Sequence, residues 1–149
     1  MKFLSQRDLR WASAKLGASN STVGRYGCTT TCISMLSDYF QCYKSPLELA
    51  HNANHYLGDL VLWPNFKFDK MKFDLRQYGR NDAHIKAALK DPNRAVILQV
   101  NDGAHWVVAY SGRVLRRDDY IIIDPWDGKK KSLLSTYKNI TGAAYFSKK

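Results

Sequence analysis

Residues 24–36 of the chain read Gly24-Arg25-Tyr26-Gly27-Cys28-Thr29-Thr30-Thr31-Cys32-Ile33-Ser34-Met35-Leu36. From Cys28 onward, apolar residues recur at the spacing of a helix that turns one face to a core. These residues are Cys32, Met35, Leu36, Tyr39 and Phe40. The stretch therefore predicts a helix that begins at Cys28, ends near Gln41 and packs against the rest of the domain.

Two glycines precede this helix. Gly24 and Gly27 permit backbone angles that other residues resist, so they predict a sharp turn at its start. Such a turn places Cys28 beside unpaired backbone N–H groups and the positive end of the helix dipole, a setting that favours thiolate over thiol. Cys28 is therefore the candidate nucleophile.

The length and composition indicate one folded domain, residues 1–149, which can bury a core without disulfides or metal. No stretch approaches the roughly 20 apolar residues that cross a bilayer. The first residues also lack the apolar segment of a secretory signal. We therefore expect a cytoplasmic protein, or one that a phage delivers by another route.

The chain carries a formal net charge of +10, with tight lysine clusters only at residues 129–131 and 148–149. This charge indicates either a solvated surface or attraction to a polyanion, such as an acidic cell wall, anionic lipid or nucleic acid. No nucleic-acid-binding motif accompanies it, so specific recognition of nucleic acid is not expected.

Three cysteines, Cys28, Cys32 and Cys42, form no disulfide framework and suit a reducing compartment. Cys28 and Cys32 resemble half of a metal site, but structural zinc usually needs four ligands and no second pair has matching spacing. We expect no metal and no organic cofactor. Cys32 and Cys42 are expected to serve packing. The remaining histidines are expected at the surface: His51, His55 and His84.

Helical signals dominate the first two thirds of the chain. Residues 6–17 form a short lead-in and residues 18–27 a loop. A serine cap, a proline and a glutamate at 45–48 begin a second helix. Asn81 and Asp82 open another helix over 83–90. Residues 58–79 fit either a strand pair or a short helix with a covering loop.

The last third consists of strand signals, at 95–100, 104–110 and 119–124, with 143–146 expected as an edge strand. Helices followed by strands indicate an α+β domain, in which an antiparallel sheet packs against the Cys28 helix.

His105 and Asp124 lie on two of these expected strands, 104–110 and 119–124. A hairpin is the simplest connection between the two strands. If its midpoint falls between Val114 and Leu115, His105 lies directly opposite Asp124, with Cβ atoms about 5 Å apart. A shift of two residues leaves the pair diagonal on one face, whereas a shift of one separates the faces. A carboxylate bound to one imidazole nitrogen leaves the other to take a thiol proton. With Cys28, the pair supplies the parts of an acyl-transfer site.

Four features carry a resemblance to a known family: Gln6, Gly27-Cys28, His105-Trp106-Val107-Val108 and Asp124-Pro125. On these residues the chain resembles the papain-like cysteine peptidases, and among them the bacteriocin-processing peptidases that remove double-glycine leaders.

The resemblance implies a papain-like fold in which Cys28 is the nucleophile, His105 the general base and acid, and Asp124 the group that orients His105. It also implies that Gln6 donates to the oxyanion beside the Cys28 backbone N–H. In those enzymes the glutamine lies a few residues before the cysteine, and a glycine follows the cysteine. Here 22 positions separate Gln6 from Cys28, and Thr29 follows, so the double-glycine preference is not carried over.

The function expected first is a cysteine peptidase that cleaves peptides or proteins, with Tyr26, Trp106 and Trp126 as candidate contacts to substrate. A phage-type peptidoglycan hydrolase, acting as amidase or endopeptidase with the same three residues, is the alternative. An alternative of another class is a catalytically silent module that binds a peptide or polyanion. In that case Cys28 is an inert core thiol, His105 an ordinary strand histidine, and Asp124 part of a turn.

Overall fold

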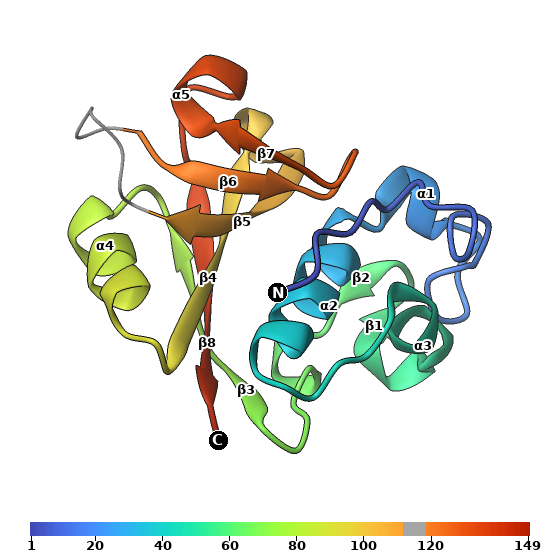
Figure 1. Ribbon diagram of the computed structural model, residues 1–149. Helices are drawn as coiled ribbons and strands as arrows, with labels where there is room; N and C mark the ends of the chain where they lie inside the picture. Colours follow the sequence, from blue (N-terminus) through green and yellow to red (C-terminus); the bar gives the residue numbers. More distant parts are fainter. Residues whose placement is uncertain (112–118) are drawn as a thin grey trace.

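The computed structural model describes residues 1–111 and 119–149 (Figure 1). The first half contains the elements α1 (Val23–Tyr26), α2 (Cys28–Tyr39), α3 (Pro46–His51), η1 (Ala53–His55), β1 (Tyr56–Leu57), β2 (Leu60–Val61) and η2 (Trp63–Asn65). The second half contains β3 (Met71–Tyr78), α4 (Asp82–Lys90), β4 (Arg94–Val100), η3 (Asn101–Gly103), β5 (His105–Ser111), β6 (Ile121–Asp124), β7 (Lys129–Ser132), α5 (Leu133–Thr136) and β8 (Gly142–Lys148).

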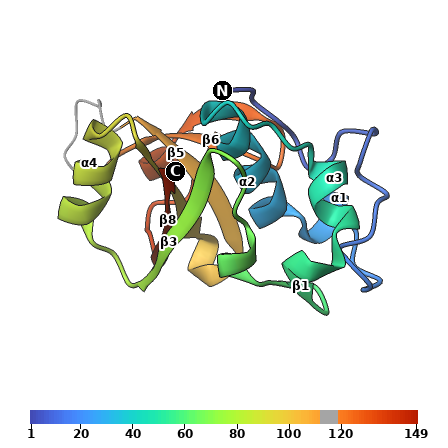
Figure 2. The same ribbon diagram turned by 90° about the horizontal axis from the view of Figure 1, so that it is seen from below.

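An antiparallel sheet of strand order β3-β8-β4-β5-β6-β7 forms the centre of the fold. Figures 1 and 2 show α1, α2 and α3 on one side of this sheet and α4 on the other. The fold is therefore α+β, with the N-terminal helices packed on an antiparallel sheet, as the sequence predicts. None of the helices in residues 1–111 and 119–149 is long and apolar enough to cross a membrane.

Helix α2 is the central helix of the domain. The sequence predicts one apolar stripe, yet every residue from Thr29 to Ser37 is buried, so the helix is covered on all sides over most of its length. It packs against β5, and the thiol of Cys32 donates to the Trp106 carbonyl oxygen across 3.4 Å. Helix α2 is thereby fixed on the strand that carries His105.

Glycine at the α1–α2 junction is required for space rather than for unusual backbone angles. Gly27 has φ −90°, which other residues also adopt. A Cβ atom at Gly27 would lie 2.5 Å from the Val23 carbonyl oxygen, and one at Gly24 would lie 2.9 Å from the Ala12 carbonyl oxygen. The predicted role of these glycines in a special turn conformation is wrong, and close packing is the reason for both.

Other helix signals are confirmed. The Ser45 hydroxyl accepts from the Glu48 N–H, and the Glu48 carboxylate accepts from the Ser45 N–H, so α3 begins with a capping box. Asn81 caps α4 through the His84 N–H. Residues 58–79, for which the sequence leaves two alternatives, contain the end of the β1–β2 hairpin, η2 and the edge strand β3.

One expectation about the sheet is wrong. Strand β8 lies between β3 and β4 and is not an edge strand. Its residues 142–146 are all buried, and a continuous apolar run is typical of an internal strand. The edge strands are β3 and β7. The sequence does not mark β7 as a strand because three lysines dominate it. Lysine is common on edge strands because it discourages pairing with further chains.

The β5–β6 pairing decides whether His105 and Asp124 share a face. The predicted hairpin midpoint, between Val114 and Leu115, lies outside the described residues. Val108 pairs with Ile123, two residues away from the predicted register. His105 and Asp124 are therefore diagonal neighbours on one face rather than directly opposite.

Gly27→Ala should destabilise the protein by about 2–3 kcal/mol, because the added methyl group overlaps the backbone of α1. Gly58→Ala is the matched control, since Gly58 has φ +63° and open space around its Cβ position. It should cost about 1 kcal/mol from backbone conformation alone. Urea unfolding of both variants measures the difference, and a Gly27→Ala cost no larger than the control would contradict the close-packing explanation.

Candidate active site

A cleft of about 390 Å³ opens where the start of α2 meets the start of β5. Three of the four residues predicted to take part in catalysis line it, namely Gln6, Cys28 and His105, as do two of the three predicted substrate contacts. The fourth, Asp124, is buried behind His105. The lining residues are Gln6, Arg25, Tyr26, Cys28, Asn101, Ala104, His105, Trp126 and Tyr137.

His105 stands between the other two residues of the predicted triad. Its Nε2 lies 2.8 Å from Asp124 Oδ1, so the ring donates this N–H to the carboxylate. The other ring nitrogen, Nδ1, is left for Cys28, and the two side chains are joined by a hydrogen bond. The arrangement in space is therefore thiol, imidazole and carboxylate in series, as a general base oriented by an acid requires.

The thiol and the imidazole shift each other's pKa. Burial alone would raise the pKa of Cys28, but the hydrogen bond and charge of His105, together with the Trp106 backbone N–H, lower it below its usual value. Burial alone would lower the pKa of His105, but its hydrogen bonds to Asp124 and Cys28 raise it to about 9. At neutral pH both shifts favour a thiolate beside an imidazolium.

The carboxylate of Asp124 is fully buried and accepts four hydrogen bonds. Oδ1 accepts from His105 and, at 3.0 Å, from the Trp126 backbone N–H. Oδ2 accepts from Lys131 Nζ at 2.9 Å and from the Tyr137 hydroxyl. Burial would raise the pKa of Asp124, yet the bonds from His105, Tyr137 and Lys131 hold it well below its usual range. Asp124 is therefore an ionised carboxylate at neutral pH.

Lys131 and Tyr137 are absent from the residues that the sequence predicts for this site. Lys131 lies two residues after Lys129, which pairs with Asp124, so strand alternation puts Lys131 on the Asp124 face. Recognising β7 as a strand would have identified Lys131. Tyr137 follows α5, and no local pattern in the sequence marks it.

Gln6 reaches the cleft through long-range backbone contacts. Its backbone N–H donates to the Pro125 carbonyl oxygen at 2.6 Å, directly after Asp124. Its buried side chain donates from Nε2 to the Gly24 carbonyl oxygen at 3.2 Å. Oε1 has no hydrogen-bond partner among the described residues. The contact with Gly24 uses one amide N–H, which leaves the second available to an oxygen in the cleft.

Two of the three predicted substrate contacts lie at the rim. Tyr26 is 56% exposed and Trp126 is 44% exposed. An arginine covers each ring, Arg25 over Tyr26 and Arg7 over Trp126.

Trp106 is a correction to the prediction. Its ring is buried beneath the cleft against Trp63 and Arg76, because successive residues of β5 point to opposite faces. Only its backbone serves the site, through the N–H that faces Cys28.

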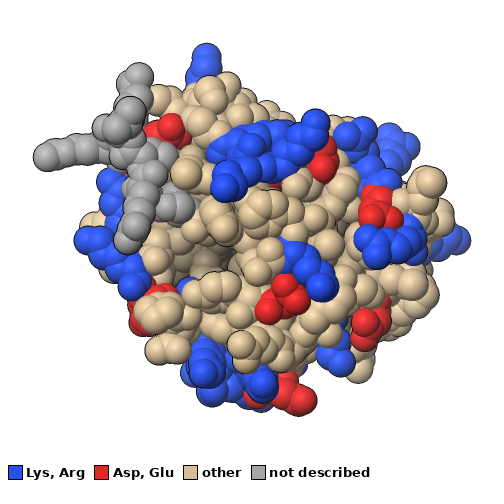
Figure 3. Space-filling view, viewed as in Figure 1, with Lys and Arg blue, Asp and Glu red and all other residues tan. Residues whose placement is uncertain are grey.

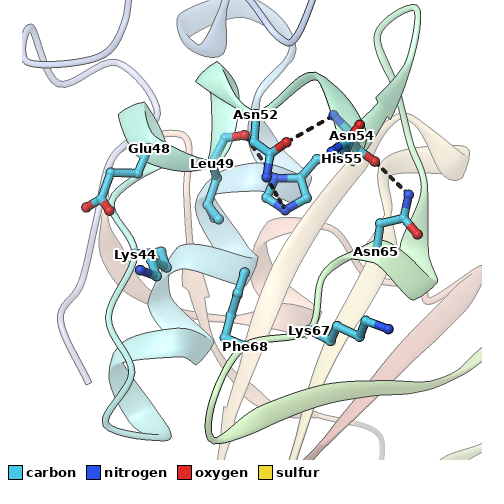
Figure 4. A pocket seen from close by; sticks show the side chains of 9 residues that line it. All are labelled: Lys44, Glu48, Leu49, Asn52, Asn54, His55, Asn65, Lys67 and Phe68. Atoms are coloured by element: carbon cyan, nitrogen blue, oxygen red, sulfur yellow. Dashed lines mark hydrogen bonds between the residues drawn. The ribbon is translucent and has the colours of Figure 1, made fainter.

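A larger hollow, of about 560 Å³, lies away from this cleft between α3, η1 and η2 (Figure 4). His55 is buried there, stacked on Phe66 and bound through Nδ1 to the Leu49 carbonyl oxygen at 3.1 Å. The expectation of a surface histidine is thus wrong, and burial lowers the pKa of His55. No cysteine or serine lines this hollow, whereas Cys28 lines the other cleft. Within residues 1–111 and 119–149, no three His, Cys, Asp or Glu side chains are grouped to hold a metal ion.

The family model described as the Peptidase C39 family matches residues 20–140. The chain belongs to the peptidase C39 family. It is therefore a papain-like cysteine peptidase of the bacteriocin-processing C39 type, which confirms the resemblance stated from the sequence. The match spans Cys28, His105 and Asp124, whereas Gln6 lies before it. A comparison with curated proteins gives no match.

In this C39 peptidase, iodoacetamide at neutral pH should alkylate Cys28 well before Cys32 and Cys42. Cys32 should resist, because burial raises its pKa well above the usual thiol value. His105→Ala should slow Cys28 labelling roughly tenfold, since loss of the imidazolium raises the pKa of the thiol. Peptide mass spectrometry measures the three sites, and equally slow labelling of all of them would contradict an activated Cys28.

Asp124→Asn should lower the free energy of unfolding by about 3 kcal/mol at neutral pH, because it leaves the Lys131 ammonium without its buried partner. The folded-state pKa of Asp124 is depressed, so its stabilisation is present above the unfolded value of about 3.9. It is lost as pH falls from there toward the folded value. Urea unfolding from neutral to acid pH should therefore show wild type and variant converging, and a difference independent of pH would contradict this.

Proposed function

We propose that this peptidase cleaves a peptide bond through Cys28, His105 and Asp124, with an acyl-enzyme intermediate. The observation that supports the proposal best is the His105 ring, which lines the cleft together with Cys28 and is held from behind by the buried Asp124. Roles for the three residues follow from this order and from the pKa shifts of thiol and imidazole.

The reaction begins when the Cys28 thiolate attacks the carbonyl carbon of the substrate, forming a C–S bond and an oxyanion. His105 donates its proton to the leaving nitrogen as the C–N bond breaks, which yields a thioester and a free amine. Water then attacks the thioester and passes a proton to His105. The acid product departs and the thiolate–imidazolium pair is restored.

The oxyanion needs donors that are already in place. The Cys28 backbone N–H lies at the start of α2, where no helical carbonyl accepts it. The second amide N–H of Gln6 is the other proposed donor, because Gly24 and Pro125 fix that side chain at the cleft. Donors fixed before the reaction stabilise charge without reorganisation. The mechanism uses no metal and no organic cofactor.

We assign the whole of residues 1–149 to one catalytic domain, with peptides or proteins as the first substrate class. Tyr26 and Trp126 give the open rim two flat apolar surfaces against which an extended peptide can pack. Trp106 is not included among these contacts because its ring is buried.

A second candidate is peptidoglycan hydrolysis by the same three residues, in an enzyme carried by a phage. The observation that favours it is charge. Lys129 and Lys130 are exposed on β7, and Figure 3 shows basic side chains gathered over this strand. With a net charge of +10, the protein should be attracted to an anionic cell wall.

Incubation of the protein with purified cell walls and, separately, with an unfolded protein distinguishes the two candidates by which substrate is cut. Cys28→Ala and His105→Ala should each abolish cleavage, since each removes a reacting group. Circular dichroism and thermal unfolding show that these variants remain folded. Cleavage retained in either folded variant would overturn the mechanism.

Gln6→Ala tests the oxyanion assignment in the same assay. It should lower kcat about 100-fold with little change in KM, because the proposed bond forms only as charge develops. A higher KM with unchanged kcat would instead assign Gln6 to substrate binding. If neither substrate is cut and Cys28 is labelled as slowly as Cys32 and Cys42, the silent binding module becomes the better interpretation.

A further inference from the structure

Lys131 lies behind the predicted triad, on the edge strand β7. Its Nζ is 2.9 Å from Asp124 Oδ2 and 3.0 Å from Asp127 Oδ2. The side chain is 23% exposed, and the Asp124 carboxylate that it contacts is fully buried. The hydroxyl of Tyr137 donates to the same Asp124 oxygen. One oxygen of Asp124 therefore serves His105, and the other serves Lys131 and Tyr137.

This division of the carboxylate has an electrostatic consequence for His105. An anion shared between an imidazolium and an ammonium stabilises each cation less than it would stabilise one alone. Hydrogen bonds to Oδ2 also draw charge away from Oδ1, the oxygen that holds His105. Lys131 and Tyr137 therefore weaken the hold of Asp124 on the His105 proton.

The same contacts have a geometric consequence. Donors to both oxygens prevent the carboxylate from rotating about its Cβ–Cγ bond. Oδ1 is held by the Trp126 N–H, and Oδ2 by Lys131 and Tyr137. The plane of the carboxylate, and with it the direction in which His105 is held, is fixed before substrate arrives.

We propose that Lys131, assisted by Tyr137, is a positioning residue that fixes the Asp124 carboxylate and sets the upper pH limit of the Cys28 thiolate–His105 imidazolium pair. This inference rests on the proposed function, because it assigns a role to the same site. Lys131 touches neither the sulfur nor the substrate cleft and acts only through Asp124.

Other titratable groups around His105 do not replace this role. Cys28 faces it from α2 and Asp124 from β6, and the Tyr137 ring lies 5.5 Å from the imidazole ring. Val100, its partner on β4, carries no charge. Further out, the cleft and its surroundings carry exposed groups, namely Arg25 and Tyr26 on α1 and Asp102 on η3. Among the described residues, Lys131 is the only lysine or arginine paired with Asp124.

The test is the pH dependence of Cys28 alkylation by iodoacetamide, followed at Cys28 by peptide mass spectrometry. A thiolate–imidazolium pair gives two inflections, the lower from formation of the pair and the upper from loss of the imidazolium proton. Lys131→Met removes the cation while keeping an unbranched side chain. It should move the upper inflection to higher pH by roughly half a unit or more.

Three further variants complete the experiment. Lys131→Arg retains the charge and should keep the upper inflection at its wild-type position. Tyr137→Phe removes one donor to Asp124 and should move the inflection upward. Asp127→Asn removes the second partner of Lys131 but leaves Lys131 on Asp124, so it should give no upward shift.

An upper inflection that stays in place in folded Lys131→Met, or that rises equally in Lys131→Arg, would overturn the inference. If Lys131→Met fails to fold, Tyr137→Phe and Lys131→Arg decide, and an unmoved inflection in Tyr137→Phe then counts against it. A wild-type protein without two inflections at Cys28 would instead overturn the proposed function. The two failures are therefore distinguishable.

Discussion

The buried carboxylate of Asp124 is the constraint on which the candidate site depends. A charge removed from water is stable only when its oxygens are hydrogen-bonded, and Asp124 meets this requirement through four donors. Those donors come from β5, β7, the turn after β6 and the residue that follows α5. Forming the carboxylate site therefore requires most of one end of the sheet to be correctly paired, and the imidazole is oriented as a result.

The residues of the candidate site come from both halves of the domain, the N-terminal helices and the sheet. Helix α2, among the N-terminal helices, carries the thiol, while the sheet carries the imidazole and carboxylate. Contact between α2 and β5, including the bond from the Cys32 thiol to the Trp106 carbonyl, holds the two sides in register. Cys32 and Trp106, which lie close to Cys28 and His105 in the sequence, thus have structural roles. Cys32 joins helix α2 to the sheet, and Trp106 fills the core.

Most local signals in the sequence predict the structure correctly, whereas several features that depend on long-range contacts are not predicted. The start of α2 at Cys28 and the Ser45 capping box depend on neighbouring residues, so periodicity and capping rules suffice. The β5–β6 register depends on a connection whose midpoint cannot be counted from composition, and the prediction missed it by two residues. The place of β8 in the sheet and the approach of Tyr137 to Asp124 are set by tertiary packing alone.

Residues 5–7 are held by hydrogen bonds against the turn that follows β6. The Ser5 hydroxyl and the Arg7 side chain both donate to the Trp126 carbonyl oxygen, and between them the Gln6 backbone donates to Pro125. Tertiary contact rather than adjacency in the sequence therefore brings Gln6, the proposed oxyanion donor, to the cleft of Cys28. On the proposed mechanism, a protein without this leading segment would keep Cys28 and His105 but lack one of the two donors to the carbonyl oxygen.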